Sequence, residues 1–577
     1  MHNQRNIVLA LVLSALLLFG WDMAMQYFYP QPVTATGERV DTPAERAARN
    51  PADGSLAAPQ DAAALKADLA SALAQPGRVR IDGPRLAGSI LLKGAVIDDL
   101  VLKDHREATN RASGPVRLFS PAGTPAQQYA RFGWVGSNIA VPGPDTVWQA
   151  EGTTLTPRTP VTLRWNNGQG LTFAIRLTID DTYLVTAEQS IANTGPNPVV
   201  VQPYGFVTRT SSNASADIWN VHSGPIGLFD GAVDFDVNYE DLDESTRVTP
   251  AGRAGWAGFT DIYWMSILAP QAGSASDATY RRLGSQLYRA ELVAEPETVP
   301  AGRSLTTKTR LFAGAKDSAV LNAYEAQGFD NLSLAIDWGW FRWIAKPTLA
   351  LLNAIFSVTA NFGLAIIGLT IIVRLLMFPI AQKQFASMAA MKALQPKMKA
   401  IQDRYKDDKP TQQQKIMELY REEKVNPLAG CLPILIQIPI FFALYKVLIL
   451  AVEMRHQPFL YIRDLAAPDP ATVLNLFGLL PFTPPGFLAI GVLAVLLGVT
   501  MWLTFKMNPA AMDPIQQQIF SLMPWLMMFV MAPFSAGLLL YWVTSNVLTI
   551  AQQKYLYSKH PGLRAQAEAD KAKAAEA

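Results

Sequence analysis

The chain of 577 residues is long enough for two or three domains. Its 49 basic and 47 acidic residues leave a formal net charge of +2, which argues against a nucleic-acid-binding protein. The single cysteine, Cys431, excludes an internal disulfide, and the 5 histidines include no pair at metal-ligand spacing. We therefore expect no metal site and no cofactor.

The first expected element is a hydrophobic segment at residues 7–29, which follows Arg5. It is long enough to cross a hydrocarbon core of about 30 Å as a helix, and it ends in aromatic residues typical of a membrane interface. We interpret residues 1–29 as an uncleaved transmembrane anchor whose N-terminus is cytoplasmic, because Arg5 follows the positive-inside rule. A signal peptide that is later removed is the alternative. Residues 30–60 are rich in Pro, Ala, Gly and charge, and are expected to form a flexible linker.

Residues 61–330 contain short runs of alternating polarity separated by turn residues. The clearest runs are residues 161–165 and 171–179, and part of residues 305–311. The sequence Asn-Asn-Gly at residues 166–168 is a hairpin signal between the first two runs. Many such runs predict an exported antiparallel β-sandwich domain.

Acidic residues of this domain offer a possible acid–base pair. They are Asp180, Asp181, Glu240 and Asp241. Acidic residues in turns are more often solvated surface, and the chain has no nucleophile motif or phosphate-binding loop. We therefore expect that the protein is not an enzyme and has no catalytic residue.

Residues 331–347 concentrate three tryptophans beside Arg342 and Lys346. This composition is typical of an amphipathic helix that lies in the membrane interface. A buried core helix is the alternative interpretation.

Residues 348–556 are expected to form a transmembrane core. Its hydrophobic segments are residues 350–380, 427–450, 486–505, 514–532 and 537–553. Together with the anchor they predict an α-helical polytopic membrane bundle of six transmembrane helices, five of which form the core. An even number of spans places both termini in the cytoplasm and residues 30–347 in the periplasm, and the excess of Lys and Arg at residues 382–424 supports this orientation.

Residues 382–424 are expected to form a cytoplasmic helical hairpin. The apolar positions of its first helix recur at spacings of three and four, and are Met391, Leu394, Met398, Ile401 and Tyr405. Thr411 and Gln414 resemble a capping box that opens the second helix. The low-complexity residues 557–577 are expected to form a disordered cytoplasmic tail.

A charged residue, Arg374, lies inside the first hydrophobic segment of the core. An arginine at the bilayer centre costs at least ~2.5–3.5 kcal/mol, and it either faces a wet functional cavity or extends to the headgroups at the cytoplasmic side. Gln437 and Asn546 are also polar residues in apolar segments, and with Arg374 they are placed to line a hydrophilic cavity. The Ser and Thr residues of these segments are consistent with simple helix packing.

Four ordered stretches of this region resemble the YidC family of membrane-protein insertases. They are residues 361–374 (NFGLAIIGLTIIVR), 387–399 (SMAAMKALQPKMK), 425–445 (VNPLAGCLPILIQIPIFFALY) and 537–546 (GLLLYWVTSN). The resemblance extends to nearly the whole chain through QRN at residues 4–6 and FAGAK at residues 312–316. Because the exported domain of Gram-negative members is a β-supersandwich, the resemblance implies that fold for residues 61–330.

The resemblance also implies a site. Arg374 matches the arginine of the family's hydrophilic groove, which opens to the cytoplasm and to lipid and is closed to the periplasm. The residues expected to line this groove are Arg374, Gln437, Asn546 and Thr370. The residues that match the family's substrate slide are Ile438, Pro439, Phe441, Leu526, Met528 and Val530.

The function implied by the resemblance is that of a membrane-protein insertase and chaperone, which integrates nascent inner-membrane proteins and helps them fold. Its expected partners are these nascent proteins, membrane lipids, the Sec translocon, and the ribosome or targeting machinery at the cytoplasmic hairpin. Two stretches depart from the family pattern. The turn at residues 533–537 lacks a proline just before its small residue and glycine, and the stretch at residues 479–486 is longer than expected.

Two other functions are compatible with parts of the sequence. A secondary transporter that binds a small anion through Arg374 would show an internal repeat with matching broken helices, and we find none. A periplasmic sugar-binding or sugar-modifying protein would use the helical region only as an anchor. Activity that is kept after deletion of residues 61–330 would rule out this last possibility.

Overall fold

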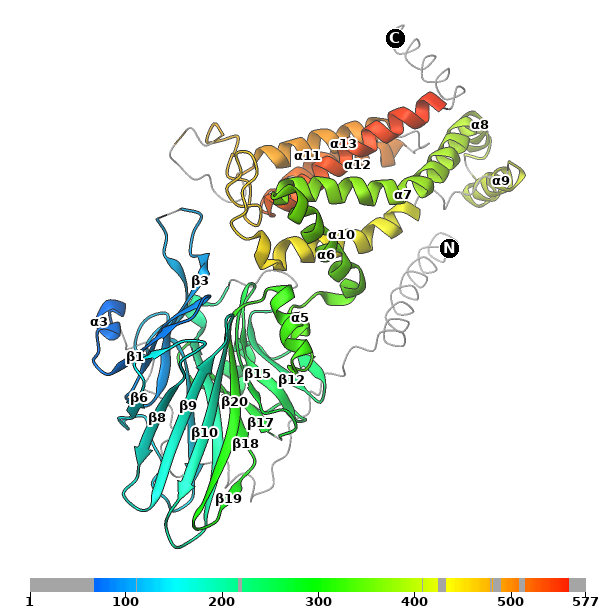
Figure 1. Cartoon of the computed structure of the whole chain (residues 1–577). Helices are drawn as coiled ribbons and strands as arrows, with labels where there is room; N and C mark the ends of the chain where they lie inside the picture. The colour runs from blue at the N-terminus through cyan, green and yellow to red at the C-terminus, as the bar shows by residue number, and fades with distance from the viewer. Residues whose placement is uncertain are drawn as a thin grey trace. The chain divides into compact units, whose positions relative to one another are not determined.

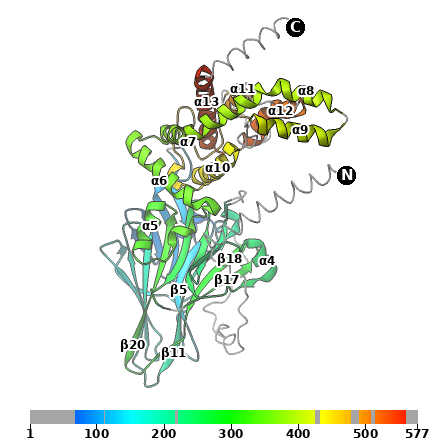
Figure 2. The ribbon, with the colours of Figure 1, turned by 90° about the vertical axis from the view of Figure 1, so that its right-hand side faces the viewer.

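The computed structural model describes residues 67–559, except for 111, 216–220, 275, 407, 424–431, 478–479, 481–488 and 508–513. It divides into a β-rich unit that ends at Asp337 and a helical unit that begins at Trp338 (Figures 1 and 2). We describe each unit by itself. The predicted anchor and linker and most of the predicted tail lie outside the described residues.

The first sheet of the β-rich unit has 11 strands in the order β14-β17-β18-β11-β5-β3-β2-β1-β7, with β19 on β11 and β4 on β3. All of its pairings are antiparallel except that of β1 with β7. Its strands are β1 (Arg78–Asp82), β2 (Leu86–Leu91), β3 (Val96–Arg106), β4 (Pro115–Phe119), β5 (Gln128–Gly136), β7 (Thr154–Leu155), β11 (Val199–Thr210), β14 (Arg247–Val248), β17 (Ser276–Gly284), β18 (Leu287–Ala294) and β19 (Glu297–Val299).

The second sheet has 9 strands in the order β13-β12-β15-β16-β20-β10-β9-β8-β6, and its pairings are antiparallel. Its strands are β6 (Gln149–Glu151), β8 (Val161–Asn166), β9 (Leu171–Ile179), β10 (Leu184–Asn193), β12 (Gly224–Phe229), β13 (Ala232–Asp234), β15 (Ala254–Thr260), β16 (Trp264–Pro270) and β20 (Arg303–Ala315). Three short helices accompany the sheets: α3 (Leu69–Leu73) precedes β1, α4 (Tyr239–Ser245) connects β13 to β14, and α5 (Ser318–Ala326) follows β20.

The two sheets enclose one core, as a sandwich requires. Trp134 of β5 is fully buried, and its ring meets the ring of Phe173 of β9 at a centroid distance of 5.1 Å. The buried amide of Gln189 on β10 donates to the backbone oxygen of Gly133 on β5 across 2.7 Å. The large β-sandwich predicted from the sequence is therefore confirmed.

The predicted hairpin is confirmed in detail. β8 and β9 pair with Asn166 opposite Thr172, and Gly168 has a φ of 73°. The side chain of Asn166 accepts from the backbone N–H of Gly168 over 2.7 Å, which stabilises the turn locally. Strand β9 buries every second residue, which explains the alternating pattern in its sequence.

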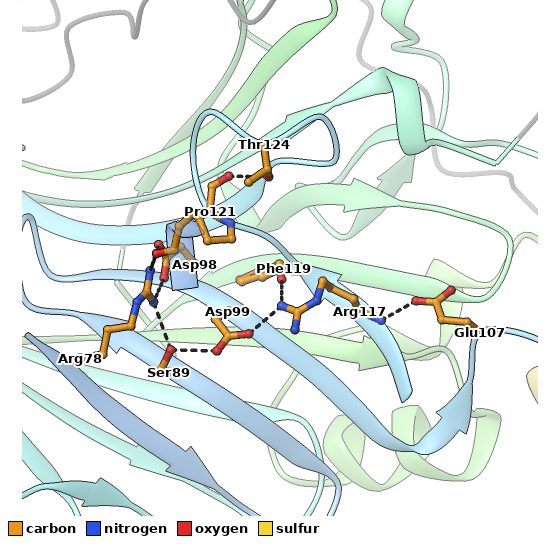
Figure 3. Close-up of polar contacts among 10 residues, drawn as sticks. Arg78, Ser89, Asp98, Asp99, Glu107, Arg117, Phe119, Pro121 and Thr124 are labelled. Carbon is orange, nitrogen blue, oxygen red and sulfur yellow. Dashed lines mark hydrogen bonds and ion pairs between the residues drawn. The ribbon is translucent and has the colours of Figure 1, made fainter. Parts of the chain in front are cut away.

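A chain of polar contacts ties the first four strands together (Figure 3). Arg78 of β1 pairs with Asp98 of β3 at 2.7 Å and also donates to Ser89 of β2 at 3.1 Å. Ser89 donates to Asp99 of β3, which accepts a second bond from Arg117 of β4 at 2.6 Å. Each carboxylate of this network thus has a cationic partner, as burial of charge requires.

The helical unit consists mainly of long helices. They are α6 (Arg342–Thr359), α7 (Phe362–Ala393), α8 (Gln395–Arg404), α9 (Lys409–Glu422), α10 (Leu432–Leu450), α11 (Val492–Met507), α12 (Pro514–Met531) and α13 (Ala536–Lys559). Helix α13 packs against α7 and α11, while α6 packs against α7 and α10, and α12 against α11.

Within the described residues one helical stretch, Phe362–Ser387, is long and apolar enough to cross a membrane by itself. Shorter apolar helical stretches are Gln437–Leu450, Val492–Met507 and Ser521–Met531. The arrangement of six spans therefore stays a prediction, since its first span lies outside the described residues.

The first hydrophobic segment of the core is divided differently from the prediction. We predicted one span over residues 350–380, preceded by a separate interfacial helix at residues 331–347. Instead, α6 runs through this boundary to Thr359, and Ala360 ends it with a φ of 51°. The side chain of Asn361 then accepts from the backbone N–H of Leu364 at 3.1 Å and opens α7. Ser357, Thr359 and Asn361 interrupt the apolar sequence at this break, and Asn361 as a possible N-cap was the available signal.

A helix pair is present where the hairpin is predicted, but two details of the prediction are wrong. The predicted first helix is divided, because α7 continues to Ala393 and α8 begins at Gln395, and the second helix has a different capping residue. Asp408, not Thr411, caps α9, and it accepts from the backbone N–H of Thr411 at 3.2 Å and from its hydroxyl at 2.6 Å. Pro410 lies in the first turn of the helix, where its missing N–H costs nothing, so the helix begins before Thr411. Helices α8 and α9 lie side by side (Figure 2), and Lys397 pairs with Glu423 at 2.5 Å.

The described residues of the segment between α10 and α11 cover one end of the bundle. The backbone N–H groups of Ala536 and Gly537, in the first turn of α13, donate to Ala467 and Leu465 over 2.8 Å each. Asp469 accepts from the N–H of Leu493 at the start of α11, also at 2.8 Å. The first turns of two helices are thus capped by this segment, which satisfies N–H groups that a helix leaves unpaired.

Candidate functional site

Three polar residues within two turns of α13 contact three other helices. The hydroxyl of Tyr541 accepts a hydrogen bond from the amide of Gln437 on α10 at 3.1 Å. Ser545, one turn further, accepts from Arg374 on α7, and Asn546 donates to Thr500 on α11 at 3.2 Å. Of the predicted groove residues, Arg374 and Gln437 thus contact one face of α13, and Asn546, at the position after Ser545, contacts α11.

Arg374 is the charged member of this polar cluster. Its Nε donates to the Ser545 Oγ at 3.0 Å, and its Nη2 donates to the same oxygen. The guanidinium is half-buried, and among the described residues no carboxylate lies within ion-pair distance of it. A guanidinium carries five N–H donors, so one hydroxyl satisfies only part of its capacity and none of its charge. The position is therefore suited to attract an anionic group.

Thr370 is placed differently from the other predicted groove residues. It lies one turn before Arg374 on α7 and is fully buried. Its hydroxyl donates to the backbone oxygen of Ile366 in the same helix at 2.6 Å. This bond joins Thr370 to its own helix, whereas Arg374 and Gln437 bond to α13.

The predicted slide residues lie on α10 and α12. Ile438, Leu526 and Val530 are exposed on the surface of the helical unit, as are the neighbouring Trp525 and Phe529. An exposed set of large apolar side chains is what a lipid-facing helix surface requires.

The other three slide residues are less exposed. Phe441 stacks on Trp542 of α13 at a centroid distance of 5.1 Å, while Met528 packs beside Gly498 of α11. Pro439 is half-buried within α10. The slide prediction therefore corresponds to an apolar surface whose inner edge is packed on α11 and α13.

Three residues of the cluster were missed or set aside by the sequence reasoning. Ser545 and Thr500 were treated as packing, and Tyr541 was not singled out. Tyr541 and Ser545 are almost fully buried and lie four residues apart on one face of α13. The spacing of Tyr541, Ser545 and Thr549 along one helix face was the available signal.

The acidic residues considered for acid–base chemistry have structural roles where contacts are known. Asp180 accepts from the backbone N–H groups of Thr182 and Leu184 in a turn, at 2.9 and 3.0 Å. Asp241 accepts from the N–H of Asn238 in the capping box of α4. Among the described residues no cluster of three or more His, Cys, Asp or Glu is placed to hold a metal ion.

Comparison with known proteins matches each of the two units to a family model. The family model of the 60Kd inner membrane protein matches residues 354–563, and that of the YidC periplasmic domain matches residues 78–351.

Curated relatives match over nearly the whole chain. The membrane protein insertase YidC of Zymomonas mobilis subsp. mobilis is 44% identical, over 97% of this chain and 96% of the relative. Those of Bradyrhizobium diazoefficiens and Nitrobacter hamburgensis are 40% and 41% identical, each over 97% of this chain and over 97% and 96% of the relatives. The chain therefore belongs to the YidC family of inner-membrane proteins.

Proposed function

We propose that this chain inserts nascent membrane proteins into the bilayer through a groove centred on Arg374, and that it assists their folding. The observation that carries the proposal is the half-buried guanidinium, which contacts Ser545 and has no carboxylate partner among the described residues. Relatives that match over nearly their whole length are named membrane protein insertases, which supports the same function.

In this proposal, Arg374 acts on the polar tail of the substrate. A short tail that must cross the membrane loses hydration as it leaves the cytoplasm, and an acidic tail recovers part of that cost beside a cation in a medium of low dielectric constant. The attraction stays weak enough for release because the groove remains open to water. Gln437 and Asn546 add hydrogen-bond donors and acceptors along the same path.

The hydrophobic segment of the substrate then moves along the apolar surface that contains Ile438, Leu526 and Val530. Burial of its side chains in lipid provides the driving force, roughly 25 cal/mol for each Å² of apolar surface removed from water. This route needs no covalent step and no nucleotide.

We further propose the topology on which this function depends. Six spans place both termini in the cytoplasm and residues 30–347 in the periplasm, with residues 1–29 as the anchor and residues 348–556 as the core. The hairpin of α8 and α9 then faces the cytoplasm, where it is placed to meet the ribosome or targeting machinery. The Sec translocon and membrane lipids are the other partners we propose.

The test is insertion into lipid vesicles that contain the purified protein. The substrate is a small single-span protein with a short acidic tail, and a version with a neutral tail serves as its control. We expect insertion by the wild type, a loss of at least tenfold in Arg374→Ala, and a partial loss in Arg374→Lys, because lysine keeps the charge but not the planar fork. The neutral tail should be far less sensitive to both substitutions.

Two results would contradict parts of the proposal. Equal insertion by wild type and Arg374→Ala would keep the insertase function but remove the charge mechanism. No insertion by folded wild type, together with uptake of a small anion, would favour a secondary transporter, which the names of the relatives do not support.

A further inference from the structure

The segment between α10 and α11 contains a tight turn with an exposed apolar tip. Phe459 and Ile462 exchange two backbone hydrogen bonds of 2.9 Å each, so Leu460 and Tyr461 form a two-residue tip. Leu460 has a φ of 53° and is 84% exposed. Tyr461 is also exposed, and its hydroxyl donates to Asp469 at 3.0 Å, which fixes the turn on the rest of the segment.

A second turn in the same segment also has exposed apolar residues at left-handed backbone positions. Leu476 donates to the backbone oxygen of Val473 at 3.2 Å, and Phe477 donates to that of Thr472 at 2.8 Å. Leu476 and Phe477 have φ values of 48° and 61°, and their exposed fractions are 51% and 59%. Both turns thus present large apolar side chains from left-handed backbone positions.

This combination is unfavourable in water for two independent reasons. Left-handed positions in tight turns favour Gly, Asn or Asp, because a bulky side chain there is strained. Exposed leucine and phenylalanine at a turn tip also keep apolar surface in contact with water. Leu460, Leu476 and Phe477 carry both penalties at once, which indicates that an apolar medium contacts these tips.

The place of the turns in the helical unit identifies that medium. The segment starts after α10 and leads into α11, and it caps the first turns of α11 and α13. It is therefore held at one end of the bundle (Figure 1). Trp340 and Trp343 are about half exposed beside the same end of α10, where Gly339 lies next to Lys446. Exposed tryptophans at the ends of apolar helices mark a membrane interface.

The charges of the segment fit the same interpretation. Asp464 accepts from the backbone N–H groups of His456 and Ala466, and Asp469 accepts from those of Ala471 and Leu493. These carboxylates are thus turned toward the protein. Arg463 is exposed beside the first tip and forms no ion pair with any described residue. A cation next to an apolar tip suits contact with lipid phosphate groups.

We propose that the tips Leu460–Tyr461 and Leu476–Phe477 insert into the lipid leaflet at this end of the bundle, with Arg463 at the phosphate level. The contact holds the segment that caps α11 and α13 against the membrane surface. The inference rests on the proposed topology only in that it requires α10 and α11 to span the membrane.

The test uses nitroxide labels at single cysteines in proteoliposomes. Cys431→Ser removes the one native cysteine, and Leu460→Cys and Phe477→Cys then place a label at each tip. Leu375→Cys, at a position 66% exposed on α7, is the lipid control, and Gln413→Cys, exposed on α9, is the aqueous control. Collision of each label with oxygen is compared with collision with a water-soluble nickel chelate.

We expect labels at 460 and 477 to show an oxygen-to-nickel collision ratio several-fold above that at 413 and close to that at 375. A ratio equal to that at 413 would place the tips in water and overturn the inference. Labels shielded from both reagents would show that protein covers the tips, which also overturns it. An aqueous ratio at 375 would instead contradict the proposed topology itself, so the two failures are distinguishable.

Discussion

The guanidinium of Arg374 on α7 is held by the hydroxyl of Ser545 on α13, with the Nε to Oγ distance at 3.0 Å. Ser545 is almost fully buried, and its hydroxyl accepts from two nitrogen atoms of the same guanidinium. A neutral acceptor fixes the position of the charge without neutralising it. This is the arrangement that a transient anionic ligand requires, since a carboxylate partner would compete with it.

Ser545 is predicted to act through Arg374. Ser545→Ala removes the acceptor but keeps the charge, so insertion of the acidic-tailed substrate should fall only a few-fold, while Ser545→Thr should retain most of it. A hydrogen bond to a charged group contributes about 1.5–3 kcal/mol when buried, and water in the groove replaces part of that. The double variant with Arg374→Ala should insert no less than Arg374→Ala alone. Additive losses in the double variant would show that Ser545 acts independently.

Gly363, in the first turn of α7, is predicted to be intolerant of a side chain. A Cβ at this position would overlap the ring of Phe459 in the segment that covers the end of the bundle. Overpacking of this kind costs about 1–3 kcal/mol, more than the helix propensity that alanine adds. Gly363→Ala should therefore lower the thermal unfolding midpoint of the protein in detergent.

The matched control is Gly368→Ala on the same helix, where the new Cβ would lie 3.3 Å from Ile355 Cγ2. This contact needs only a small adjustment, so the control should unfold close to the wild type. Equal midpoints for the two variants would mean that Phe459 does not pack on Gly363.

The buried ion pair of Arg78 and Asp98 is predicted to stabilise the β-sandwich strongly. Their side chains are 10% and 4% exposed. Asp98→Ala leaves the arginine buried without its partner, which typically costs about 3–5 kcal/mol. Urea unfolding of the β-rich unit, followed by tryptophan fluorescence, measures the loss.

The exposed pair of Glu151 and Arg164 provides the control, since its side chains are 60% and 50% exposed. Glu151→Ala should change stability by no more than about 1 kcal/mol. A similar small effect for Asp98→Ala would show that water reaches Arg78 in the folded protein.

His222 is predicted to make the β-rich unit less stable in mild acid. Burial lowers the pKa of His222 below its ordinary value of 6.5, against the effect of the Pro225 oxygen 2.6 Å from its Nε2. The unfolded chain then binds a proton more readily than the folded one, so stability is complete above pH 6.5 and falls as the pH drops through 6.5 toward the folded pKa. The slope cannot exceed about 1.4 kcal/mol per pH unit for one proton.

The measurement compares thermal unfolding midpoints of wild type and His222→Gln from pH 7.5 to 5.5. Glutamine can still donate to Pro225 but does not titrate, so the difference between the two proteins isolates the histidine from the carboxyl groups. The midpoint of the wild type should fall relative to the variant as the pH decreases. A constant difference between the midpoints of wild type and variant across this pH range would show that the pKa of His222 is the same in the folded and unfolded states.

Local patterns were sufficient for the type of the elements whose periodicity is clear. The period of two in β9 and the turn residues Asn166 and Gly168 predicted a strand and a hairpin that the structure contains. This pattern is local because successive side chains of a strand point to opposite faces of the sheet. Helix ends were harder. Asp408 and Thr411 are both acceptable caps, and the choice depended on where Pro410 fits in the first turn.

The sequence by itself determined that the protein joins an antiparallel β-sandwich to apolar helices with Arg374 in one of them. These features follow from periodicity and from the cost of a charge in an apolar segment. Only the tertiary structure decided that Arg374 meets Ser545, which lies 171 residues away in the chain, and that Thr370 turns its hydroxyl to its own helix. Hydrogen-bond partners of polar side chains depend on how helices pack, and no local pattern encodes that packing.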